Sequence, residues 1–66
     1  MARQLEINGR KYWILSEPLD DAWKSKDLEV RDTGDTEELG IDALAETRVA
    51  ADDAAERKLR RLLEAH

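Results

Sequence analysis

The chain has 66 residues, no cysteine and a formal net charge of −5. A chain this short builds one thin hydrophobic core, which rarely supplies more than about 3–5 kcal/mol without a disulfide, a metal or an oligomer. Disulfides are excluded, and the single histidine, His66, argues against a zinc site, so we expect no cofactor. Self-association or a binding partner is then the expected source of extra stability.

The acidic balance also limits the possible partners. Proteins held on nucleic acid mainly by phosphate contacts show a basic face, so a net charge of −5 argues against that class and fits a basic protein surface. No apolar run approaches the roughly 18–20 residues that span a bilayer. The missing cysteines fit a reducing compartment. We therefore expect a cytoplasmic protein without membrane contact.

The first predicted element is a β-hairpin around Asn8-Gly9, the turn pair that best tolerates the positive φ angles of a two-residue type I′ turn. Such a turn fixes the strand register and places Leu5 opposite Tyr12. One face of the hairpin then carries apolar side chains, and the other mixes Glu6 and Lys11 with Trp13 and Leu15. The predicted apolar face comprises Leu5, Ile7, Tyr12 and Ile14.

A short helix is predicted next, over residues 16–25. Ser16 or Glu17 suits its N-cap and Pro18 its first turn, and the spacing of Leu19, Ala22 and Trp23 places them on one helix face. Trp23 is the expected lid on the hairpin. Residues 28–31 alternate in polarity and favour a third strand with Leu28 and Val30 facing inward.

The last predicted element is a long helix after the turn-forming residues 32–36. Asp35 with Glu38 has capping-box spacing and Asp42 is a competing N-cap, so the helix is expected to begin between residues 36 and 43 and to end near Ala65. Asp53 with Glu56 allows a second helix after a break. The whole chain, 1–66, is expected to form one domain with a hairpin part, 1–34, and a helical part, 35–66.

Alternating steps of four and three residues from Ile41 to His66 predict a seam along this helix. Its ends are apolar and its middle carries Arg48 and Asp52, a pattern that favours an antiparallel helix pair with matched charges across a twofold axis. The alternative is that Arg48 and Asp52 pair within one helix and the stripe packs on its own hairpin. The predicted dimer interface is Ile41, Leu44, Arg48, Asp52, Ala55, Leu59 and Leu62.

Sequence patterns that would indicate catalysis are weak. Asp32-Thr33-Gly34 matches the short signature of aspartic proteases, but it lies between Arg31 and Asp35 rather than in an apolar framework. Neither serine, Ser16 or Ser25, has a histidine partner within a motif. We therefore expect Asp32-Thr33-Gly34 to form a plain turn and the protein to be non-enzymatic.

These observations predict an α+β protein that acts as a small acidic protein-binding module through a helix-mediated homodimer. An adaptor or an inhibitor, of the kind a phage or mobile element encodes, fits this size and composition. The predicted partner-binding residues are Trp13, Leu15, Glu46, Asp53 and Glu56. The alternative is a dimeric nucleic-acid-binding regulator, which requires one basic face formed by Arg3, Arg10, Lys11, Arg57, Lys58, Arg60 and Arg61.

Overall fold

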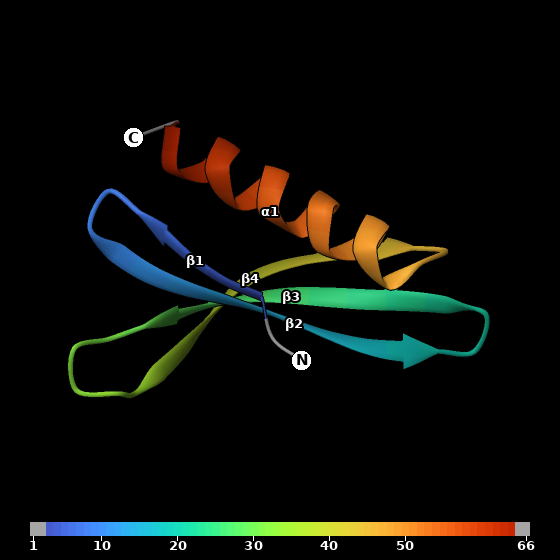
Figure 1. Cartoon of the computed structure of the whole chain (residues 1–66), viewed down its shortest axis with the longest axis horizontal. Helices are drawn as coiled ribbons and strands as arrows, with labels where there is room; N and C mark the ends of the chain where they lie inside the picture. The colour runs from blue at the N-terminus through green and yellow to red at the C-terminus, as the bar shows by residue number, and fades with distance from the viewer. Residues whose placement is uncertain (1–2, 65–66) are drawn as a thin grey trace.

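The computed structural model describes residues 3–64 and has an α+β architecture, as predicted. Four antiparallel strands lie side by side in chain order, and one helix crosses one face of the twisted sheet (Figure 1). No helix in this part of the chain is long and apolar enough to cross a membrane. The elements are β1 (Arg3–Ile7), β2 (Arg10–Leu19), β3 (Ala22–Val30), β4 (Thr36–Ala45) and α1 (Arg48–Glu64).

The first hairpin forms in the predicted register. Leu5 lies opposite Tyr12 and Ile7 opposite Arg10. Asn8 and Gly9 adopt φ angles of 54° and 80°, which are the left-handed values that a two-residue turn of this type requires. The turn pair and the alternation of the strands therefore determine this part of the fold together.

The predicted short helix over residues 16–25 is wrong. Residues up to Leu19 continue β2, and Ala22 begins β3, so the segment is a second hairpin. Asp20 has a φ of 47°, a conformation that aspartate tolerates better than most residues. Trp23 is a half-buried strand residue opposite Pro18 rather than a helical lid. Pairing along the full length of β2 outweighs the local helix signals.

The predicted start of the long helix is also wrong, because residues 36–45 form β4. Gly40 has a φ of 74°, and the pairing of β3 with β4 shifts register between Lys26 and Leu28. The helix begins at Arg48, where the Thr47 hydroxyl accepts a hydrogen bond from the Ala50 amide at 3.1 Å. It continues without a break to Glu64. The seam residue His66 and the expected helix end at Ala65 lie outside the described residues.

The hydrophobic core lies between α1 and the sheet. Small residues Ala51 and Ala55 bring the helix close to the strands, and Leu59 is fully buried beneath it. Ile14 of β2 and Ala43 of β4 complete the central cluster. The helical stripe therefore packs on the sheet of its own chain, which was the alternative arrangement considered from the sequence.

Candidate functional site

The face of the sheet that α1 does not cover carries a band of apolar side chains. Successive strand residues point to opposite faces, and Tyr12 and Ile14 are buried on the helix side. Trp13 and Leu15 therefore lie on the other side, which we call the open face. Through the strand register, Leu28 and Val30 share this face, so their predicted inward orientation is wrong. The large apolar residues of the open face are Trp13, Leu15, Leu19, Leu28, Val30 and Leu44.

Trp13 and Leu28 form the centre of the open face. They lie directly opposite each other in the β2–β3 pairing, and Leu28 is only 6% exposed although it is on the side without a helix. Leu15 and Val30, on either side, are half-buried. Leu44 on the edge strand is 66% exposed. The face therefore has a tightly packed apolar centre and an accessible apolar margin.

Charged pairs between β3 and β4 lie beside this apolar centre. The Lys26 ammonium lies 3.0 Å from the Glu38 carboxylate, and that hydrogen bond raises the pKa of Lys26. The Lys24 ammonium lies 3.8 Å from the Asp42 carboxylate. Exposed pairs of this kind contribute little to stability, but they place both signs of charge beside one apolar patch. A partner that binds this face can therefore carry both positive and negative side chains, without an excess of either.

Two shallow hollows lie beside the apolar residues. One, of about 330 Å³, is lined by Leu15, Ser16, Glu17, Lys24 and Lys26. The other, of about 290 Å³, includes Trp13 and Lys11 among its lining residues. The open face thus offers apolar projections and recesses together, which is the surface shape that packed protein interfaces require.

The residues predicted as one dimer seam are divided between two elements. Ile41 and Leu44 belong to β4, Arg48 is the first residue of α1, and Asp52 lies within α1. Asp52, Ala55 and Leu59 are buried against the chain's own sheet. The continuous helical seam expected from the spacing therefore does not form.

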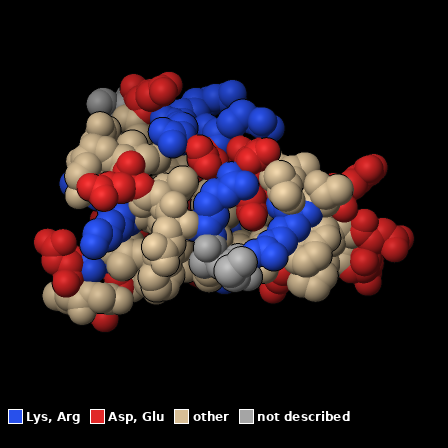
Figure 2. Space-filling model, in the orientation of Figure 1, with Lys and Arg blue, Asp and Glu red and all other residues tan. Residues whose placement is uncertain are grey.

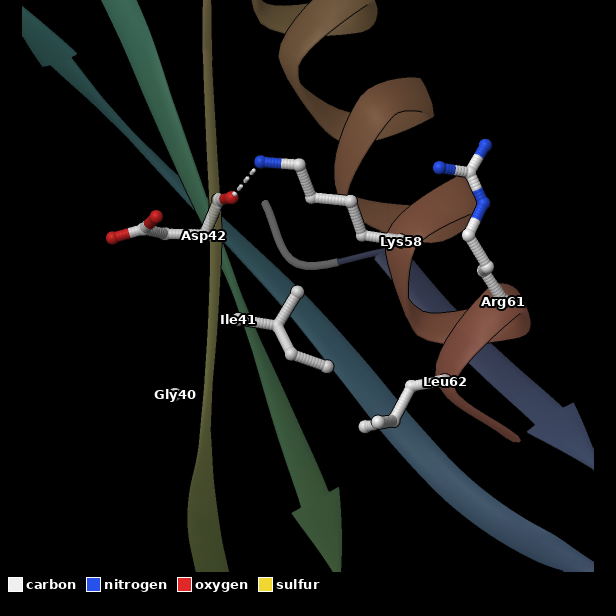
Figure 3. Close-up of a pocket in the computed structure, with 6 residues that line it drawn as sticks. All are labelled: Gly40, Ile41, Asp42, Lys58, Arg61 and Leu62. Carbon is white, nitrogen blue, oxygen red and sulfur yellow. Dashed lines mark hydrogen bonds between the residues drawn. The ribbon is translucent and has the colours of Figure 1, made fainter. Parts of the chain in front are cut away.

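Ile41 and Leu62 of the same chain point towards each other across a groove between β4 and α1 (Figure 3). The groove measures about 490 Å³. Lys58 donates a hydrogen bond of 2.7 Å to the Asp42 carbonyl oxygen at its margin, while the Asp42 carboxylate extends away from α1. Arg61 points away from the two apolar side chains. Ile41 and Leu62 therefore line opposite sides of one groove in a single chain.

The residues predicted to bind a partner lie on two sides of the molecule. Trp13 and Leu15 lie together on the open face. Glu46 follows β4, and Asp53 and Glu56 lie on α1. The Arg3 guanidinium is 2.9 Å from Asp53 and 3.1 Å from Glu56, and these hydrogen bonds raise the pKa of Arg3. The two α1 carboxylates therefore hold the edge of the sheet.

The basic residues of the alternative prediction lie mostly on the helix side of the sheet. Arg3 and Arg10 share that side with Arg57, Lys58, Arg60 and Arg61 of α1, and of the seven only Lys11 lies on the open face. Carboxylates accompany three of them: Arg3 and Arg60 share Glu56, and Arg10 lies 3.9 Å from Glu29. Figure 2 shows basic and acidic side chains interleaved over the visible side of the molecule. This arrangement does not favour a continuous phosphate-binding surface.

A polar cluster lies beneath α1 on the covered face of the sheet. The Ser25 hydroxyl donates a hydrogen bond of 2.6 Å to the Asp52 carboxylate, and both residues are buried. Asp27 is only 1% exposed, and neither of its carboxylate oxygens has a hydrogen-bond partner. Burial raises the pKa of Asp27 to about 7; the nearby Lys58 charge opposes this shift and the Glu56 charge adds to it.

Sequence reasoning missed Asp27 and the true orientation of Leu28. Inward positions 25 and 27 are polar while outward positions 28 and 30 are apolar, so the usual alternation identifies the wrong face of β3. The orientation of β3 follows from its pairing with β2, because residues directly opposite each other in the two strands point to the same face of the sheet. Polar residues at buried positions are the reason that the pattern was misleading.

Among residues 3–64, no group of three or more histidine, cysteine, aspartate or glutamate side chains is arranged to hold a metal ion. Comparisons with family models, curated proteins and solved structures gave no match. The open face, with its apolar centre and paired charges, is accordingly the candidate site that the geometry of the chain defines.

Proposed function

We propose that this chain is a small non-enzymatic protein-binding module that works as a homodimer, and that two copies join through their open faces. The observation that carries the proposal is the apolar centre at Trp13 and Leu28 on the side of the sheet that α1 does not cover. Apolar side chains on a sheet face that no other element covers are typical of protein interfaces, and the accessible ones here are Leu19, 42% exposed, and Leu44. We propose the open face rather than α1 as the dimer interface, because the apolar stripe of α1 already packs on the sheet of its own chain.

Charge supports a second copy as the occupant. Lys24 and Lys26 lie on the open face beside Glu38 and Asp42. A twofold axis through such a face can bring basic positions of one copy near acidic positions of the other. A strongly basic partner would face the two lysines with like charge, and a strongly acidic partner would face the two carboxylates with like charge.

The size of the face also fits a modest dimer. The four strands have five, ten, nine and ten residues, and at about 3.3 Å per residue and about 4.8 Å between strands they give a face of about 540 Å². Two such faces bury about 1,100 Å² in total, which is just above the roughly 1,000 Å² that a specific interface needs. Two sheets packed face to face form a sandwich whose thin cores support each other.

The dimer leaves acidic turns available for a further protein. Asp20 and Asp21 connect β2 to β3, and Asp32 and Asp35 lie between β3 and β4, and all four are exposed. Figure 2 shows acidic side chains gathered towards both ends of the long axis. An adaptor or inhibitor that binds a basic protein surface is the function that this distribution supports.

Sedimentation velocity tests the proposal, with the parent, Trp13→Glu and Val49→Glu proteins compared from low to high micromolar concentration. Val49 is 63% exposed on α1 and provides a matched control for an added charge at an apolar surface position. The parent and Val49→Glu proteins should dimerise, and Trp13→Glu should remain monomeric with an unchanged circular dichroism spectrum. A parent that stays monomeric, or a Trp13→Glu protein that still dimerises, would overturn the proposal.

One further variant separates the two possible interfaces. Leu62→Glu changes a residue that is 41% exposed on α1 and belonged to the predicted helical seam. Open-face pairing leaves its dimer intact. Loss of the dimer in Leu62→Glu but not in Trp13→Glu would instead favour association through the helix.

A further inference from the structure

We infer that Asp27 is a proton-controlled latch for α1: the neutral carboxyl group allows the helix to pack on the sheet, and the ionised group loosens it. The inference is independent of the proposed dimer, because Asp27 lies on the covered face of the sheet. It begins with an uncommon feature, a carboxyl group that is 1% exposed and has no hydrogen-bond partner at either oxygen.

The position of Asp27 makes hydration difficult. It lies opposite Ile14 in the middle of β3, which is paired on both sides by β2 and β4. The β4 residues near it are those around the register shift, Leu39, Gly40 and Ile41, and none of these three is titratable. Water therefore reaches an ionised Asp27 most directly if the overlying helix moves.

Polar side-chain contacts hold α1 to three strands of the sheet. Ser25 of β3 bonds to Asp52, Lys58 bonds to the Asp42 carbonyl oxygen of β4, and Arg3 of β1 pairs with Asp53 and Glu56. Lys58 is the nearby cation that lowers the pKa of Asp27, yet its ammonium group is engaged at β4. Charged and titratable groups on the same side of the sheet as Asp27, or facing it from the helix, come from all five elements. They are Arg3 of β1, Arg10 and Tyr12 of β2, Glu29 of β3, Glu37 of β4, and Asp52, Glu56 and Lys58 of α1.

The direction of the pH effect follows from proton binding. Burial raises the pKa of Asp27 to about 7 in the folded chain, whereas an unfolded or hydrated aspartate has the usual value of 3.8. The packed state therefore binds more protons between these values. The contribution of Asp27 to helix packing is complete below about pH 4 and is lost as the pH rises through about 7.

Native-state hydrogen exchange tests this latch in the full chain at pH 5 and pH 8, after correction for intrinsic exchange rates. In the parent protein, the opening equilibrium of the α1 amides should increase by at least about tenfold at pH 8. Asp27→Asn, which keeps the shape and removes the titration, should show little change. Asp53→Asn is the matched control, because Asp53 is an exposed α1 carboxylate paired with Arg3, and the ratio of its opening equilibria at pH 8 and pH 5 should equal that of the parent.

Two comparisons make the result decisive. The β2 amides should show a smaller change than the α1 amides, and an equal change would mean global unfolding rather than a latch. Carbon-detected NMR should find the Asp27 carboxyl group titrating near neutral pH, with a higher midpoint in Lys58→Met because the opposing cation is removed. Titration of Asp27 below about pH 5, or equal pH dependence in the parent and Asp27→Asn, would overturn the inference.

Discussion

Individual buried polar residues account for much of the unusual chemistry of this chain. Ser25 and Asp52 satisfy each other across the interface between β3 and α1, whereas Asp27, two residues along β3, has no such partner. The difference matters because a buried polar group costs free energy unless it is hydrogen-bonded. On the same face of β3, Ser25 therefore stabilises the fold through its hydrogen bond, and the buried carboxyl group of Asp27, which has no partner, destabilises it.

Ser25→Ala should reduce the free energy of unfolding by about 1–3 kcal/mol, because it removes a donor from a buried charged acceptor. Urea denaturation at fixed protein concentration measures the change. Thr33→Ala is the matched control, since it removes an exposed hydrogen bond of 3.2 Å to Asp35 and should cost less than about 0.5 kcal/mol. Equal midpoints for Ser25→Ala and the parent would contradict the assigned role of this contact.

Among the secondary-structure elements, α1 depends on a single neutral cap. Its first turn contains no acidic residue, and Thr47 supplies the acceptor for the Ala50 amide. Thr47→Ala should destabilise the protein by about 0.5–2 kcal/mol, as measured by thermal denaturation. Thr47→Ser retains the hydroxyl and should stay close to the parent. A loss in Thr47→Ser as large as that in Thr47→Ala would mean that the methyl group, not the cap, is responsible.

The elements also differ in how well the sequence predicts them. The first hairpin is predicted with its register, because Asn8-Gly9 and the strand alternation agree with each other. The second hairpin is missed because Pro18 is a common first-turn helix residue, although here it lies in β2. Strand β4 is missed because its residues other than Gly40 individually suit a helix. Gly40, with its positive φ, was the local sign against that helix.

The candidate site was predicted only in part, for a related physical reason. Trp13 and Leu15 were assigned to one face correctly because the hairpin register places them there. Leu28 joins them only through pairing between β2 and β3, which local sequence does not reveal. Of the predicted seam, Ala55 and Leu59 lie on the buried stripe of α1, but the spacing alone does not identify what covers that stripe.

For the molecule as a whole, one helix covers the central core cluster, so a single large side chain beneath it carries much of the stability. Leu59 is fully buried. Leu59→Ala should cost about 2–5 kcal/mol, which is comparable with the total stability expected for a chain of this size. We expect a largely unfolded protein at 25 °C by far-ultraviolet circular dichroism at fixed protein concentration.

Leu62→Ala supplies the comparison for this prediction. Leu62 is 41% exposed at the margin of the β4–α1 groove, so its truncation should leave the protein folded with a loss below about 1 kcal/mol. If Leu59→Ala melted within a few degrees of the parent, the core would have to collapse around the lost side chain more fully than small cores usually do.

The order of the strands has a consequence for how the molecule is made. Because each strand pairs with the one before it in the chain, every hairpin can form as soon as its second strand is synthesised. The helix that covers Tyr12 and Ile14 follows all four strands. During synthesis the sheet therefore exposes these two apolar residues until α1 leaves the ribosome, and a nascent chain halted before Arg48 presents a surface that chaperones bind.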